Sequence, residues 1–164
     1  MKLEIELVPS SLWGFSLYGF YSKANPSRWR EIKEEIKSRE GEKCWICGRQ
    51  GKPFRLEAHE FWDYDEKNKI QKLVAIHHLC SQCHRVKHIG RSLFTAEGQQ
   101  ELGEKGKQQL ISHFCKVNKC SESDFKKHQK ESFEIFQRRS RLDWYQDFGV
   151  YEEEIRNILL KGNK

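Results

Sequence analysis

The segments Cys44-Trp45-Ile46-Cys47 and Cys80-Ser81-Gln82-Cys83-His84-Arg85-Val86-Lys87-His88 decide the fold of this chain. Each contains a Cys-x2-Cys pair, here called a knuckle, which is a short turn that presents two thiolates to one metal ion. Four thiolates complete the tetrahedral coordination that Zn²⁺ prefers, so we expect one structural zinc ion rather than four ordinary buried thiols. The expected ligands are Cys44, Cys47, Cys80 and Cys83.

The second knuckle leads directly into a pair of histidines that a four-cysteine site does not need. His84 and His88 are four residues apart, so on a helix they project from one face. We expect His59 to lie on a strand that crosses this helix. Three imidazoles can bind a transition metal and leave positions open for water and a phosphate oxygen. The sequence therefore predicts a second, open metal site, although any one of these histidines alone would more simply be a surface or core residue.

The segment between the knuckles is patterned for a β-hairpin. Apolar and polar residues alternate over 54–59, as in a half-buried strand. Residues 63–68 form a polar turn, and residues 70–79 read as the return strand, although its first half could also be helical. A short helix over 84–89 follows, with Gly90 as its C-cap. The predicted order is knuckle, strand, turn, strand, knuckle and helix.

The flanking segments add one strand and several helices. Residues 2–8 alternate in the manner of a strand, and residues 12–21 read as an irregular buried segment or, alternatively, as a flat surface for stacking bases. Asn25 and Pro26 begin a helix that Gly41 ends.

The C-terminal part of the chain reads as helical. Thr95 is a weak helix start, and the glycines within 98–106 argue against one long early helix. Apolar residues over 107–117 have helical spacing, a serine-capped helix runs over 121–141, and a short last helix follows within 143–160.

The composition is compatible with a nucleic-acid partner. The chain has 164 residues, 33% of them charged, with a net charge of +6. The excess is concentrated in residues 41–95, which hold 10 Lys and Arg against 6 Asp and Glu. Arg85, Lys87 and Arg91 are candidate contacts to phosphates. A plain solvated basic surface explains the same charges equally well.

Nothing in the sequence indicates a membrane partner. No stretch approaches the ~20 apolar residues that span a bilayer, and the first residues lack a signal-peptide core. We therefore expect a cytoplasmic protein. In a reducing compartment, paired cysteines bind metal more readily than they form disulfides.

Cys44-x2-Cys47, then Leu56-Glu57-Ala58-His59, then Leu79-Cys80-x2-Cys83-His84-x2-Lys87-His88 resemble the zinc-containing branch of the HNH endonucleases. The resemblance covers roughly residues 41–92 and implies an α+β protein with a ββα-metal core stapled by the four-cysteine zinc site. We expect residues 1–40 to add an N-terminal strand and helix that pack on this core, and residues 93–164 to form a C-terminal helical extension.

The resemblance also implies a reaction. One divalent ion such as Mg²⁺, Mn²⁺, Ni²⁺ or Zn²⁺, held by His59, His84 and His88, would bind the scissile phosphate of DNA. In this family an Asp-His or His-His pair ends the first strand, its first member a metal ligand and its second the general base. Here His59 matches the ligand and Glu60 stands where the base belongs. Alternatively, His59 is the base while His84 and His88 hold the metal.

A second departure concerns the asparagine of the family pattern, which buttresses the loop that carries the base. Ala75 stands at that position, and His77 or His78 could substitute for the asparagine. The two departures leave three functions open. The first is a DNA endonuclease, the second is a non-catalytic zinc module that binds nucleic acid, and the third is an adaptor that docks a protein through its C-terminal helices. A protein partner or a homodimer is compatible with each of these functions.

Overall fold

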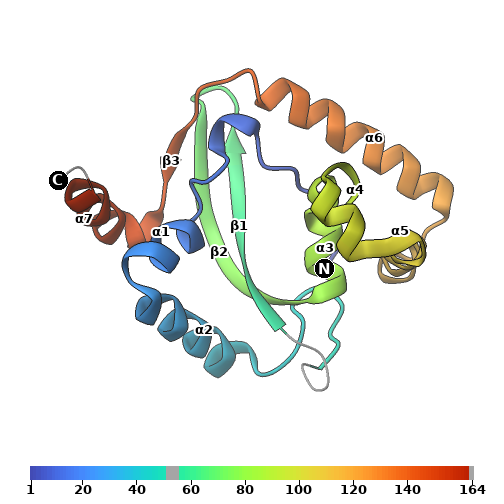
Figure 1. The fold of residues 1–164 in the computed structure, drawn as a ribbon, viewed down its shortest axis with the longest axis horizontal. Helices are drawn as coiled ribbons and strands as arrows, with labels where there is room; N and C mark the ends of the chain where they lie inside the picture. Colours follow the sequence, from blue (N-terminus) through green and yellow to red (C-terminus); the bar gives the residue numbers. More distant parts are fainter. Residues whose placement is uncertain (51–55, 163–164) are drawn as a thin grey trace.

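The computed structural model describes residues 1–50 and 56–162, and its centre is a three-stranded sheet in the order β1-β2-β3 (Figure 1). β1 (Leu56–Asp65) and β2 (Ile70–Cys80) form an antiparallel hairpin, and β3 (Tyr145–Asp147) pairs in parallel with the first residues of β2. Helices lie on both sides of the sheet, so the predicted α+β class is confirmed.

Two groups of helices cover the two sides of the hairpin (Figure 1). One side carries α1 (Leu17–Ala24), α2 (Pro26–Glu40) and α7 (Glu152–Gly162). The other side carries α3 (Ser81–Lys87), α4 (Ile89–Phe94), α5 (Ala96–Asn118) and α6 (Glu122–Arg139). The short 3-10 turns η1 (Ser10–Leu12) and η2 (Gly149–Tyr151) precede α1 and α7. Among the residues that the structure describes, no helix combines the length and the apolarity needed to cross a membrane.

Each group of helices buries its own core against the hairpin. The core on the α2 side is formed by Leu17, Tyr21, Trp29, Ile32, Ile36, Leu73, Ile76, Phe148 and Ile155. The core on the α3 side includes Leu3, Ile5, Cys44, Ile46, Leu79, Cys80, Cys83, Val86, Ile89, Leu110, Phe114 and Phe125. Residues from 1–40, 41–92 and 93–164 share this second core, so the knuckles are packed between the N-terminal segment and α5.

Local sequence signals account for the hairpin and for α2. β2 is one residue longer than the predicted strand over 70–79, and β1 continues through Asp65, beyond the point where the turn was expected to begin. Asp65 closes the turn, since its carboxylate accepts a hydrogen bond from the Asn68 amide at 3.0 Å. Residues 54 and 55, where the first strand was expected to begin, lie outside the described residues.

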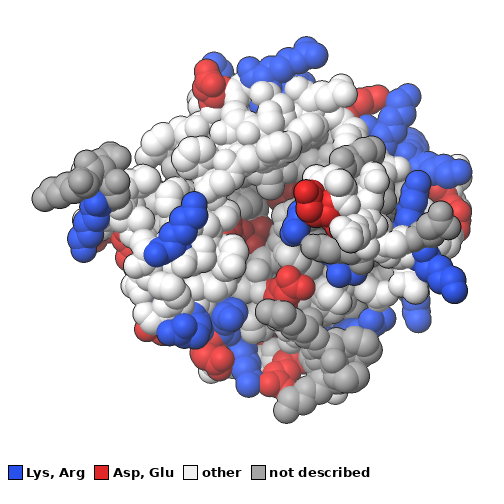
Figure 2. Space-filling model, in the orientation of Figure 1, with Lys and Arg blue, Asp and Glu red and all other residues white. Residues whose placement is uncertain are grey.

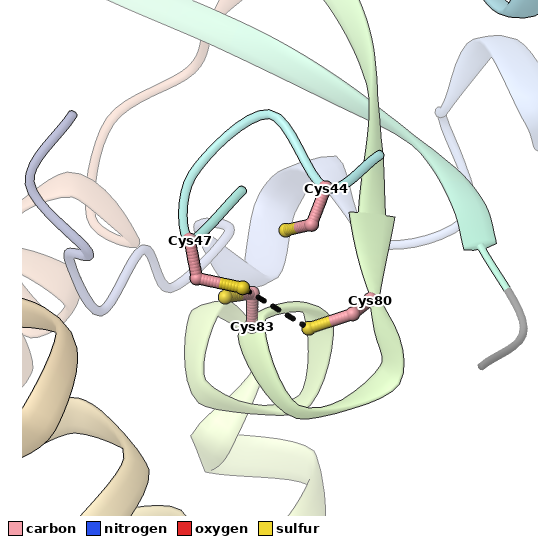
Figure 3. A group of neighbouring side chains, drawn as sticks. All are labelled: Cys44, Cys47, Cys80 and Cys83. Carbon is pink, nitrogen blue, oxygen red and sulfur yellow. Dashed lines mark hydrogen bonds between the residues drawn. The ribbon is translucent and has the colours of Figure 1, made fainter. Parts of the chain in front are cut away.

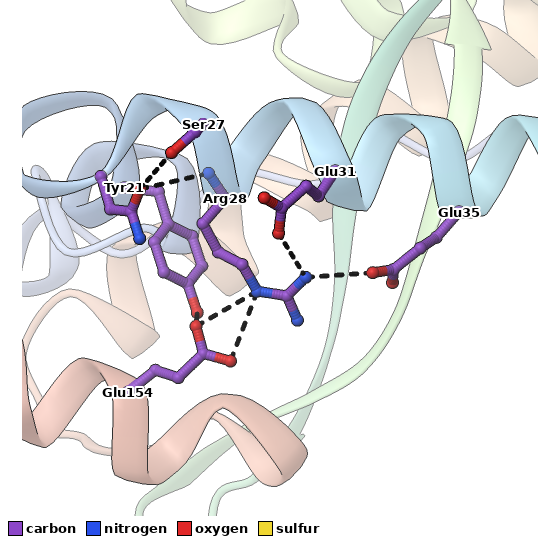
Figure 4. A network of polar contacts seen from close by, with 7 residues as sticks. Tyr21, Ser27, Arg28, Glu31, Glu35 and Glu154 are labelled. Atoms are coloured by element: carbon purple, nitrogen blue, oxygen red, sulfur yellow. Dashed lines mark hydrogen bonds and ion pairs between the residues drawn. The ribbon is translucent and has the colours of Figure 1, made fainter.

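The predicted helix after Asn25 is confirmed as α2. The Asn25 side chain accepts a hydrogen bond from the backbone of Arg28, and Gly41 ends the helix with a φ of 72°. Arg28 then joins α2 to α7, because its Nε lies 3.2 Å from Oε2 of Glu154 (Figure 4). The Tyr21 hydroxyl of α1 donates to the same carboxylate at 2.6 Å. One carboxylate therefore connects the three helices on this side.

Residues 2–8 do not form the predicted strand. They form neither a helix nor a strand, and no strand among the described residues pairs with them, although Leu3 is fully buried as the alternation required. Side chains take the place of a partner strand. The amide of Leu3 donates to Oδ1 of Asn118 at 2.8 Å, and Nδ2 of Asn118 donates to the carbonyl of Leu3 at 2.8 Å. The amide of Ile5 donates to Nε2 of His128 at 3.0 Å.

We expect Asn118→Ala to destabilise the protein by about 2 kcal/mol, because it leaves the buried N–H and C=O of Leu3 without partners. Denaturant unfolding measures this change. The matched control is Asn157→Ala on an exposed position of α7, which should shift stability by no more than about 0.5 kcal/mol. Equal stabilities of the two variants would contradict the proposed role of Asn118.

Three further segments differ from the sequence predictions. Residues 12–21 are not irregular throughout, because Ser16 caps α1 by accepting a hydrogen bond from the Gly19 amide at 2.9 Å. Gly90 is not a C-cap but lies within α4, where a Cβ would come within 2.9 Å of the Leu7 side chain. Its role is close packing of α4 on the N-terminal segment. β3 was not predicted, because its three residues are too short for a recognisable alternation.

The remaining helices follow their expected signals. Thr95 caps α5, and Gly103 interrupts this helix with a φ of 61°, in line with the glycines that argued against one long helix. Ser121 caps α6 in a capping box with Asp124. α6 ends at Arg139, two residues before its predicted end.

Candidate metal centres

Four cysteines converge on one point between the first knuckle, the end of β2 and the start of α3 (Figure 3). The Sγ atoms of Cys44, Cys47, Cys80 and Cys83 all lie within 4.8 Å of one another. Gly48 allows the tight turn of the first knuckle, since its φ is 71° and its amide donates to the carbonyl of Cys44 at 2.9 Å. The arrangement predicted from the two pairs is therefore present, and it can hold a metal ion such as zinc.

The chemistry of the cluster favours a bound cation. Three of its four cysteines are at most 1% exposed. The hydrogen bond to the Cys44 thiolate, together with burial, raises the pKa of Cys80 to about 11. Four sulfurs packed this closely do not ionise together at neutral pH without a positive charge among them, and a divalent metal supplies that charge.

A histidine from α5 contacts the cluster and was not predicted. Nε2 of His113 lies 3.1 Å from Sγ of Cys83, and the His113 side chain is buried. An imidazole N–H that donates to a metal-bound thiolate disperses part of its negative charge. No spacing in the sequence connects His113 with the knuckles, because α5 meets α3 only through tertiary packing.

The three predicted histidines form a second cluster. His59 comes from β1, whereas His84 and His88 come from one side of α3 and its C-cap. One ligand nitrogen of each lies within 4.8 Å of the others, and the ring centroids are 4.8 to 5.2 Å apart. Nε2 of His88 faces Nδ1 of His59 at 3.2 Å. The three side chains are thus close enough to share one ion.

The environment of this cluster suits metal ligands. Burial lowers the pKa of His88 to about 3 and holds the pKa of His59 well below its ordinary value. Both imidazoles are therefore neutral at physiological pH, and neutral imidazole is the form that binds metal. The hydrogen bond between His88 and His59 uses one ring N–H, and an ion bound by both nitrogens would replace that proton.

Glu57 orients one of these histidines and was not assigned a role from the sequence. Its Oε2 lies 3.2 Å from Nδ1 of His84, which leaves Nε2 of His84 as the nitrogen free to bind metal. A carboxylate behind a metal-binding histidine fixes the ring and strengthens the ligand. Glu57 is two residues before His59, so the two-residue period of a strand places both on one face and could have identified it.

Glu60 does not lie in the histidine cluster, and this corrects its expected role as the base. Consecutive residues of a strand point to opposite faces, so Glu60 faces α1 while His59 faces α3. Its carboxylate accepts a hydrogen bond from the Tyr18 amide at 2.8 Å. Burial raises the pKa of Glu60, but its distance from the three imidazoles follows from the side of the sheet on which it lies.

His77 and His78 occupy opposite faces of β2. His77 pairs in register with His59 and lies on the same face, against Phe61. Nδ1 of His77 is 2.7 Å from Oε1 of Glu40, and Trp45 stacks on the imidazole with centroids 3.9 Å apart. His78 is buried on the other face, so only His77 can act on the side where the histidine cluster lies.

The three cations expected to contact phosphates are placed differently from one another. Arg85 and Arg91 are exposed. Lys87 is only 4% exposed, and its ammonium forms an ion pair with Glu6 and lies 4.5 Å above the Phe61 ring centroid. Its placement contradicts the expected surface contact. The N-terminal segment covers Lys87, and no sequence pattern near the knuckles indicates that.

Comparisons of this chain with family models, with curated proteins and with solved structures find no match. The residues and their geometry are therefore the basis for any functional conclusion.

Proposed function

We propose that this protein is a metal-dependent endonuclease of the HNH type, which hydrolyses phosphodiester bonds of DNA. One observation carries the proposal: His59, His84 and His88 place three ligand nitrogens within 4.8 Å of one another. We assign zinc to the four cysteines and a catalytic divalent ion to the three histidines. The consecutive order of β1, β2 and α3 supports a ββα-metal core.

The protein's own groups have separate tasks in this reaction. His59 and His88, kept neutral by burial, bind the ion, and Glu57 holds the ring of His84 in position for the same purpose. A divalent ion bound there supplies a Lewis acid that polarises a phosphate oxygen and stabilises the leaving 3′-oxygen. Arg85 and Arg91 are exposed, and we assign them contacts with neighbouring phosphates.

The proton acceptor is the part of the family pattern that this chain changes. Because Glu60 lies on the opposite face, we assign His77, and not Glu60, as the base that accepts the proton of the attacking water. Glu40 holds Nδ1 of His77, so its Nε2 is the nitrogen that can accept a proton. Stacking on Trp45 fixes the plane of the ring. His59 is the alternative acceptor if His84 and His88 alone hold the ion.

Nicking of supercoiled plasmid DNA tests the proposed function. The purified full chain is incubated with Mg²⁺, Mn²⁺, Ni²⁺ or Zn²⁺, and the His84→Ala variant is assayed in parallel. We expect cleavage by the unmodified protein with at least one of these ions. Cleavage that is equally fast with His84→Ala belongs to a contaminant, and absence of cleavage with every ion rejects the endonuclease.

A non-catalytic module that binds nucleic acid is the second candidate. The placement of Glu60 on the far face favours it, because the residue at the family's base position cannot reach the histidine cluster. This module would bind DNA in a salt-dependent manner and cleave it with none of these ions.

Glu57→Gln should weaken metal binding at the histidine cluster about 10- to 100-fold while leaving the cysteine cluster intact. The amide loses the charge that stabilises the ring orientation of His84. Isothermal titration calorimetry with Mn²⁺ measures the affinity of the protein for this ion. Glu153→Gln, at an exposed position of α7, is the matched control, and an unchanged Mn²⁺ affinity for Glu57→Gln would argue against the second metal site.

A further inference from the structure

An open groove of about 480 Å³ lies beside the cysteine cluster, on a surface to which no function has yet been assigned. Its walls come from the first knuckle, α3 and α5. The residues that bear on its chemistry are Arg49, Gln82, Lys105, Gln109, Ser112 and Lys116. None of the described residues that line the groove carries a carboxylate. The lining therefore offers hydrogen-bond donors and positive charge to a ligand.

The contribution of α5 is a continuous polar stripe. Lys105, Gln109, Ser112 and Lys116 follow one another at intervals of three or four residues, so they share one face of the helix. Eleven residues of helix span about 16 Å, which is close to the rise of five base pairs in DNA. A lysine stands at each end, with an amide and a hydroxyl between them. This length exceeds what one small anion requires and suits an extended polyanion.

The wall opposite α5 is built on the metal-binding segment. Nη1 of Arg49 donates to Oε1 of Gln82 at 2.9 Å, which links the segment after the first knuckle to α3 within this wall. His113, which also lines the groove, contacts Cys83. The groove is therefore positioned by the same cysteine cluster that positions the histidines.

Positive charge predominates around the groove. Residues 105–130 hold seven lysines and two carboxylates, Glu122 and Asp124, and Glu122 accepts a hydrogen bond from Gln108 in the lining of the groove. Lys and Arg side chains gather on the side of the molecule that carries α5 and α6, at the right of Figure 2. The broadest uncharged surface in the same view lies toward the upper centre, and further Lys and Arg side chains lie at the left. A polyanion would thus be attracted to the groove side.

We propose that this groove binds the sugar–phosphate backbone of a nucleic acid. Lys105, Lys116 and Arg49 contact phosphates, while Gln109 and Ser112 donate hydrogen bonds to backbone oxygens without reading the sequence. Gln82 faces the groove, whereas His84, two residues later on α3, faces β1. A nucleic acid that occupied both the groove and the histidine cluster would therefore contact α3 on two sides. The identity of the polyanion rests on the proposed function.

Salt-dependent binding of a fluorescently labelled DNA duplex tests the groove. Fluorescence anisotropy gives the dissociation constant of the full chain over a series of salt concentrations, with no divalent ion added. The groove variant is Lys105→Gln with Lys116→Gln. The matched control is Lys23→Gln with Lys161→Gln, exposed lysines of α1 and α7 that change the net charge equally. Circular dichroism and zinc content verify that both variants fold.

We expect the groove variant to lower the slope of log K against log salt by about 2, because each lysine that leaves a phosphate reduces it by about 0.9. The control should retain the slope of the unmodified protein. Equal slopes for the groove variant and the control overturn the proposal. Cleavage is not measured, so a failed endonuclease test leaves this result interpretable.

Discussion

Replacing Cys80 with serine is expected to remove the metal from the cysteine cluster and to destabilise the protein by at least about 5 kcal/mol. Cys80 joins β2 to α3 and lies in the core formed with Val86 and Phe114. A structural zinc ion contributes about 10–16 kcal/mol of binding energy, which exceeds the stability of most domains. Losing it separates the first knuckle from the hairpin and removes the support of α3.

The expected readout is a fall in the melting temperature of about 10–20 °C, or loss of a cooperative transition. Zinc content measured by elemental analysis should fall from one ion per chain to none at this site. Cys115→Ser is the matched control, because Cys115 lies outside the four-cysteine cluster. It should retain zinc and change stability by less than about 1 kcal/mol. A Cys80→Ser protein that keeps its zinc and its melting temperature would refute the metal assignment.

His84→Ala should retain zinc at the cysteine cluster and lose both the second ion and DNA cleavage. His84 is one of the three residues that could hold the second ion, and it is the one that Glu57 contacts. Loss of metal activation of the phosphate should lower the cleavage rate at least about 100-fold, equivalent to roughly 3 kcal/mol in the barrier. The fold should be unaffected, since His84 is partly exposed and lies outside the buried core.

Metal counting and single-turnover cleavage together check this expectation. Elemental analysis of protein loaded with Mn²⁺ and Zn²⁺ should give one ion fewer in His84→Ala than in the unmodified chain. The zinc of the cysteine cluster serves as an internal control for folding. If the variant binds both ions, or if it cleaves DNA at the original rate, the three histidines do not form the catalytic site.

Local signals in the sequence predicted the elements whose hydrogen bonds join residues that are close together in the sequence. Asn25 and Gly41 mark the two ends of α2 because caps act on the adjacent turn. Residues 2–8 show the limit of such signals. Their alternation correctly predicts that Leu3 is buried, but the partners of their backbone groups lie far along the chain: Asn118 for Leu3, His128 for Ile5 and the Lys87 carbonyl for Glu6. No local pattern identifies those partners.

The prediction for Glu60 was wrong for a reason that the sequence contains. The predicted alternation covered residues 54–59, and the base role of Glu60 came only from its position in the family pattern. β1 instead continues through Glu60 in register with Ile76. Strand alternation then sends Glu60 to the opposite face. A longer strand was compatible with the apolar residues that follow, so the error lay in the boundary and not in the periodicity.

The sequence by itself determined which residues gather at the two candidate metal centres. Cys-x2-Cys turns and a four-residue helical interval are local geometry, and a hairpin between them brings both sets together. Only the tertiary structure decided the surroundings of these centres: Lys87 buried under Glu6, His113 beside Cys83, and Glu60 facing α1. These contacts depend on how the N-terminal segment, α5 and α1 pack on the hairpin. Such packing is set by the whole buried surface and not by any short stretch of sequence.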